Sequence, residues 1–115
     1  MHELSIMNNV LQLALRVADE NNGKEVRVIE LEAGVMSGVV EKYAQSFFKL
    51  LSQGTIAEHA QLKFTAIPAH FICKKCGENL IIYEPGTEFY CENCGSEKLK
   101  LTSGMGFRMT GITII

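Results

Sequence analysis

Apolar side chains near the amino terminus follow a helical period. They recur at three- and four-residue spacing and so share one face of a helix: Leu4, Met7, Leu11, Ala14, Leu15 and Ala18. The Asn21-Asn22-Gly23 segment predicts the end of this helix, because Gly23 can adopt the left-handed conformation at little steric cost.

A second helix is predicted after Ser37, which has the side chain of an N-cap residue. Its apolar stripe consists of Val40, Tyr43, Ala44, Phe47, Phe48 and Leu51. Gly54 is expected to end it. We expect this apolar stripe to pack against one face of a sheet.

Three segments are typical of strands. Residues 26–33 form the first, although the adjacent Val28 and Ile29 break the alternation and leave its buried face open. Residues 62–66 alternate between apolar and polar side chains, and Pro68 ends this strand because it has no amide hydrogen to donate. Residues 106–115 are β-prone again and are predicted to rejoin the main sheet. The order favours an α+β fold with two helices on a three-stranded sheet.

The stretch from Phe71 to about Lys100 differs in character. It consists of short segments separated by Cys, Gly and Pro, with too few large apolar residues for a core of its own. We therefore expect a main α+β domain of residues 1–69 plus 103–115. Residues 70–102 would be an inserted domain that needs a metal ion or a cross-link for stability.

Two Cys-x-x-Cys-Gly motifs lie in this insertion, Cys73 to Gly77 and Cys91 to Gly95. Two intervening residues let both thiolates of a motif reach one ion, and the following Gly allows a tight turn whose amides can bond to sulfur. Four thiolates leave no open coordination position. The predicted centre is therefore a structural zinc site with the ligands Cys73, Cys76, Cys91 and Cys94.

Other chemistries remain open for these cysteines. Iron also accepts four tetrahedral thiolates, and disulfides or a dithiol redox pair are further alternatives. The loop between the motifs contains Ile81, Tyr83, Glu84-Pro85-Gly86 and Tyr90, which predict a small hairpin of the zinc-ribbon type. Four lysines could offset the charge of the thiolates: Lys74, Lys75, Lys98 and Lys100.

Length and charge narrow the possible functions. The chain has 115 residues, a net charge of −2 and an isoelectric point near 5.9, which argue for one modest core and against nucleic acid as the main ligand. Neither a leader peptide nor a long apolar stretch is visible, so a cytoplasmic protein without a membrane partner is expected. In that reducing compartment, cysteines favour metal binding over disulfides.

The first three residues offer several metal donors within reach of one ion. These are the Met1 α-amine, the His2 backbone nitrogen once it is deprotonated, the His2 imidazole, and a Glu3 group. This donor set suits Ni(II) or Cu(II). A histidine near a chain end is also commonly just solvated. His59 and His70, farther along the chain, are likewise expected to be solvated and not to bind metal. We find no nucleophile elbow, phosphate loop or open metal-site motif, so we do not expect an enzyme.

Taken together, four segments resemble the HypA family of nickel metallochaperones. They are Met1-His2-Glu3-Leu4-Ser5, Gly34-Val35-Met36-Ser37-Gly38-Val39, Gly54-Thr55-Ile56-Ala57-Glu58 and the paired cysteine motifs. The resemblance implies that His2 is the essential nickel ligand, with the Met1 amine and Glu3 completing or adjoining the site. It also implies zinc at the four cysteines, in a domain inserted into a nickel-binding domain.

The implied function is to accept Ni(II) and pass it to the hydrogenase large-subunit precursor, together with the maturation GTPase of that pathway. Service to urease is a further implication. The alternative from another class is a zinc-ribbon module that binds protein or nucleic acid through its lysines. A rubredoxin-like electron carrier is the third hypothesis, and the colour of bound ferric iron would identify it.

Overall fold

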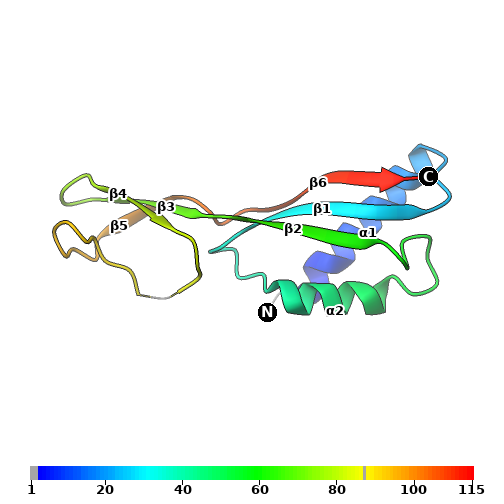
Figure 1. The fold of residues 1–115 in the computed structure, drawn as a ribbon, viewed down its shortest axis with the longest axis horizontal. Helices are drawn as coiled ribbons and strands as arrows, with labels where there is room; N and C mark the ends of the chain where they lie inside the picture. Colours follow the sequence, from blue (N-terminus) through cyan, green and yellow to red (C-terminus); the bar gives the residue numbers. More distant parts are fainter. Residues whose placement is uncertain (1–2, 87) are drawn as a thin grey trace.

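The computed structural model describes residues 3–86 and 88–115. In chain order its elements are α1 (Glu3–Glu20), β1 (Val26–Gly34), α2 (Glu41–Leu51), β2 (Gln61–Ile67), β3 (Ala69–Cys73), β4 (Asn79–Ile82), β5 (Leu99–Ser103) and β6 (Phe107–Ile114). The strands form two sheets, β2-β1-β6 and β4-β3-β5, toward opposite ends of an elongated molecule (Figure 1). The radius of gyration is 17.5 Å, against about 13 Å for a compact chain of this length. We call α1, β1, α2, β2 and β6 the main lobe, and residues 69–103 the cysteine lobe.

The main lobe confirms the predicted two helices on a three-stranded sheet. Strand β1 is central and runs parallel to β2 and antiparallel to β6. A parallel pair requires a crossover connection, which α2 supplies. Both helices share one hydrophobic core with β1 and β2, including Met7, Ile29, Leu31, Phe48 and Leu62. The last strand, β6, returns from the cysteine lobe to the main sheet as expected.

Helix α1 ends at the predicted segment, but the residue with the left-handed conformation there is not the predicted one. Asn22, with φ of 54°, takes the left-handed conformation that we assigned to Gly23. The amide of Gly23 instead donates to the carbonyl of Ala18 at 2.7 Å, and a Cβ on Gly23 would lie 3.1 Å from that oxygen. Glycine is favoured here by the close approach of two backbone segments. Asparagine tolerates the left-handed region better than most residues do.

Helix α2 begins later than predicted. Its N-cap is Val40, which makes no side-chain cap hydrogen bond, and its first residue is Glu41. The Ser37 hydroxyl accepts a hydrogen bond from the Val39 amide at 3.3 Å, within the preceding turn. The assignment of Ser37 as N-cap is wrong because Gly38 follows it with φ of 80°, a conformation that a right-handed helix excludes.

A β-bulge resolves the buried face of β1. Val26 pairs with Ile114 of β6, whereas Val28 pairs with Thr113, so β1 has one extra residue between these pairs. Such a bulge shifts the alternation of side chains by one position. Both Val26 and Ile29 are consequently buried, three residues apart.

The two lobes join at a tight crossing of three backbone segments. Gly104, with φ of 102°, follows β5, and a Cβ there would lie 2.5 Å from the Cα of Ala69 at the start of β3. A Cβ on Gly34, at the end of β1, would overlap the Gly104 carbonyl. That carbonyl accepts a hydrogen bond from the Met36 amide at 2.8 Å. The chain therefore enters and leaves the cysteine lobe at one closely packed point.

The cysteine lobe differs from the predicted hairpin. Strand β3 pairs antiparallel with both β4 and β5, and the described residues of the loop around Glu84-Pro85-Gly86 form no strand. The hairpin prediction is wrong because the first cysteine motif itself supplies the turn. The amide of Cys73 donates to the carbonyl of Glu78 at 2.8 Å, which directs β4 back along β3. Phe89 of the long loop packs against Phe71, with ring centroids 5.4 Å apart.

Candidate metal centre

The two cysteine motifs form matching turns at the tip of the cysteine lobe. In the first turn, the amide of Gly77 donates to the carbonyl of Cys73 at 2.9 Å. In the second, the amide of Gly95 donates to the carbonyl of Cys91 at 2.7 Å. Both glycines have positive φ, 81° and 75°. The turns that the sequence predicted from a glycine after each motif are therefore present.

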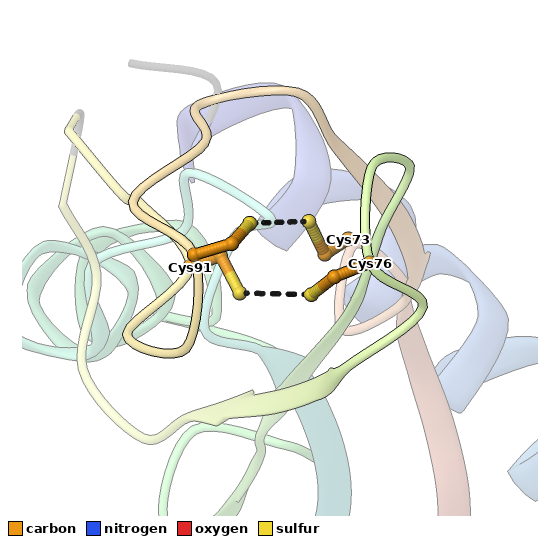
Figure 2. Close-up of side chains that lie close together, drawn as sticks. Cys73, Cys76 and Cys91 are labelled. Atoms are coloured by element: carbon orange, nitrogen blue, oxygen red, sulfur yellow. Dashed lines mark hydrogen bonds between the residues drawn. The ribbon is translucent and has the colours of Figure 1, made fainter.

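These turns bring the four Sγ atoms within 4.8 Å of one another. The Sγ atoms of Cys73 and Cys94 are 3.6 Å apart, as are those of Cys76 and Cys91. Figure 2 shows the contact between Cys76 and Cys91 as a dashed line. A tetrahedral ion with sulfur ligands at about 2.3 Å requires sulfurs about 3.8 Å apart, whereas a disulfide requires about 2.05 Å. The arrangement fits one closed four-thiolate site and does not fit disulfides. Zinc and iron both suit this geometry.

The four sulfurs differ in exposure and in their hydrogen bonds. Cys73 and Cys91 are buried, whereas Cys76 and Cys94 are exposed. The side-chain amide of Asn93 donates to the sulfur of Cys76 at 3.5 Å. Cys94 lines a hollow of about 460 Å³ together with Lys74, Lys75, Gly95, Ser96 and Lys98. Three of the four lysines named from the sequence thus lie beside the centre.

In the absence of a metal ion, the thiols differ in acidity. The backbone amide of Cys76 lowers the pKa of Cys73 to about 6. The Asn93 side chain lowers the pKa of Cys76. The Ser96 amide also lowers the pKa of Cys94, but desolvation and the neighbouring sulfurs outweigh it and raise this pKa to about 11. Metal binding must therefore displace a proton, and it weakens as the pH falls.

The amino-terminal donors are only partly covered by the structure. Met1 and His2 lie outside the described residues. Glu3 is the first residue of α1, and only 3% of it is exposed. Its Oε2 accepts a hydrogen bond from the Val40 amide at 3.0 Å. Because Val40 is the N-cap of α2 and lacks a side-chain cap, Glu3 supplies an acceptor at the start of a helix 37 residues away.

This contact stabilises the ionised form of Glu3. The hydrogen bond from the Val40 amide is the main reason why the pKa of Glu3 falls from 4.5 to about 2. The positive ends of two helix dipoles, those of α1 and α2, favour a negative charge at the same place. Glu3 is therefore a fixed carboxylate that ties the first turn of α1 to the start of α2.

Replacement of Glu3 by Gln should lower the thermal midpoint of unfolding at pH 7. Because the pKa of Glu3 is lower in the folded state, its charge stabilises the fold above the unfolded value near 4.5. This stabilisation is lost as the pH falls toward 2. Thermal melts from pH 7 to pH 2 should therefore converge for Glu3→Gln and the unmodified protein at the acid end. A constant difference across this range would contradict the prediction.

The other histidines are exposed, His59 before β2 and His70 on β3. Among residues 3–86 and 88–115, the four cysteines are the one group of metal-ligating side chains close enough to share an ion. No described helix is long and apolar enough to cross a membrane. Sequence reasoning missed two polar contacts, Asn93 to Cys76 and Glu3 to Val40. Both join distant segments, and neither has a local sequence signal.

Comparison with known proteins extends over the whole chain. Residues 1–114 match the family model HypA, described as hydrogenase/urease nickel incorporation, metallochaperone. A hydrogenase maturation factor HypA from Dechloromonas aromatica is 34% identical over 116 residues, which cover 99% of each chain. One from Dehalococcoides mccartyi is 34% identical over 120 residues, which cover 99% of this chain and 94% of that one.

A solved structure has the same fold. It is the solution structure of the Ni metallochaperone HypA from Helicobacter pylori, with a TM-score of 0.66 and 20% identity. The alignment covers 100% of this chain and 98% of that one.

Proposed function

Because the chain belongs to the HypA family of metallochaperones for nickel incorporation and hydrogenase maturation, which are not enzymes, we propose that it binds Ni(II) at its N-terminus. It then delivers the ion to a nickel-iron hydrogenase. The family match from the first residue onward carries this proposal, because it includes the donor-rich end of the chain.

The proposed nickel ligand set centres on His2. The His2 imidazole and the His2 backbone nitrogen bind the ion, the latter after it has lost its proton to solvent, and the Met1 α-amine and Glu3 complete or adjoin the site. Consecutive residues of one chain end can form such a chelate, and nitrogen and oxygen donors suit Ni(II). The Glu3–Val40 hydrogen bond supports this location, since it fixes the residue that directly follows His2.

Delivery follows from the small number of ligands. A chelate made of two or three adjacent residues lets an acceptor displace the donors one at a time. The role in hydrogenase maturation implies partners within that pathway. We propose that these are its maturation GTPase and the hydrogenase large-subunit precursor, both met in the cytoplasm.

The cysteine centre has a structural role in this proposal. Cys73, Cys76, Cys91 and Cys94 hold one zinc ion, whose chemistry is to cross-link the two turns of a lobe. The closed set of sulfurs supports a structural ion, because a catalytic zinc keeps a position for water or substrate. We propose that residues 70–102 form this zinc domain, inserted into a nickel-binding domain of residues 1–69 plus 103–115.

Two other hypotheses from the sequence explain less of the molecule. A zinc-ribbon binding module or a rubredoxin-like carrier would involve the cysteine lobe alone. The match to the HypA model includes the main lobe and the amino terminus as well. Neither alternative gives a role to the first residues.

A metal titration of untagged protein tests the proposal. We expect one zinc per chain before nickel is added, and one zinc plus one nickel per chain afterwards. Nickel that enters only as zinc leaves would place both ions at the cysteines and contradict an N-terminal site. Iron in place of zinc would contradict the structural zinc.

A further inference from the structure

The two turns of the cysteine centre are alike in backbone but differ in the protection of their exposed sulfurs. In each turn the first cysteine is buried and the second, Cys76 or Cys94, is exposed. A reagent that attacks the folded centre therefore reaches these two residues more readily than the buried pair.

Cys76 has a hydrogen-bond donor from the facing turn. The Asn93 side-chain amide hydrogen-bonds to its sulfur at 3.5 Å. Such a bond withdraws electron density from the thiolate and occupies part of its exposed surface. The residue of the first turn that corresponds to Asn93 is Lys75, and its side chain lines the hollow next to Cys94.

The surroundings of Cys94 are positively charged. Lys74, Lys75 and Lys98 are exposed, and all three line the hollow of about 460 Å³ that Cys94 also lines. A concave surface with charge of one sign raises the local concentration of ions of the opposite sign. Anionic molecules should therefore accumulate at this sulfur.

We propose that Cys94 is the labile ligand of the zinc centre, reached by small anionic thiol reagents and anionic ligands through the lysine-lined hollow. Asn93 protects Cys76, so the bond between zinc and Cys94 is the one that breaks first. This inference rests on the proposed zinc occupancy but not on the proposed nickel site. Metal analysis before the experiment separates failure of the zinc proposal from failure of this one.

Alkylation of the zinc-loaded full-length protein tests the order of attack. With iodoacetate, the sulfur of Cys94 forms a bond to carbon, iodide leaves, and the zinc loses one anionic ligand. We expect substoichiometric iodoacetate to label Cys94 about fivefold faster than Cys76, as measured by peptide mass spectrometry. Equal rates at these two cysteines, or simultaneous labelling of all four, would overturn the proposal.

Two sets of variants separate the causes. Asn93→Ala should bring the labelling rate of Cys76 close to that of Cys94 with the neutral reagent iodoacetamide, and part of the way with iodoacetate, because the lysines beside Cys94 remain. Glu92→Gln, at an exposed neighbouring residue, should leave the iodoacetamide rates at both cysteines unchanged. The double variant Lys75→Gln, Lys98→Gln should slow iodoacetate at Cys94 but not the neutral reagent iodoacetamide. If Asn93→Ala has no effect on Cys76, or if both reagents slow equally, the proposed protection or the proposed charge effect is wrong.

Discussion

Replacement of His2 by Ala should abolish one-to-one nickel binding while the zinc content stays unchanged. The imidazole is the side-chain nitrogen donor of the proposed site, and a change at a chain end carries little structural cost. A few residues added before Met1 should have the same effect, because they remove the α-amine from the chelate and preserve every side chain. Nickel titrations with metal analysis of both variants measure this result. Hydrogenase maturation should be lost together with nickel binding.

His59→Ala is the matched control, since it removes an exposed imidazole far along the chain. Its nickel stoichiometry should stay at one. For the unmodified protein, binding should weaken as the pH falls, because protons compete for the amine and the imidazole. Undiminished nickel binding by His2→Ala would contradict the N-terminal site and would direct attention to His59, His70 and the cysteines.

Removal of the zinc ion that we propose at the four cysteines should unfold the cysteine lobe and leave the main lobe folded. Structural zinc supplies about 10–16 kcal/mol of binding free energy, which is available only when the lobe is folded. The lobe has little else to hold it, because Phe71 is its one buried large apolar residue besides the cysteines among those that the structure describes. The main lobe, by contrast, contains the continuous core of α1, β1, α2 and β2.

Circular dichroism and amide exchange measure this outcome. After chelation, the helical signal should stay nearly constant, and amides of β3, β4 and β5 should lose protection. Addition of zinc to the chelated protein should restore the protection. Protected strands in the fully chelated protein would show that the lobe does not depend on the ion.

The main lobe was predictable because its patterns are local. Helical spacing located α1 and α2, and alternation located β2. The errors concern features that depend on distant segments: the bulge in β1 exists only against β6, and β4 pairs with β3 because the turn at Cys73 directs it there. The predicted start of α2 at Ser37 is wrong because the positive φ of Gly38, which no side-chain pattern indicates, prevents a helix from starting there.

In the metal centre, too, local features were predictable and contacts between distant segments were not. The spacing of the cysteines predicted which sulfurs meet, since two residues between thiolates fix the turn. The exposed pair and its unequal protection could not be predicted, because the contact of Asn93 with Cys76 joins two turns across a long loop. Likewise, the role of Glu3 in fixing α2 depends on how two helices cross, which no local pattern describes.

The crossing at Gly104 also has a consequence for the order of folding. Strand β1 forms its ladder with β6 only after roughly 40 residues between β2 and β6 have been brought into a closed loop. A folded cysteine lobe shortens that loop to a few effective residues. The entropic free-energy cost of closing it then falls by about 1–2 kcal/mol. A chain that has already bound the proposed zinc ion should therefore complete the central sheet faster. The refolding rate of the main lobe would then report on an ion that does not contact this lobe.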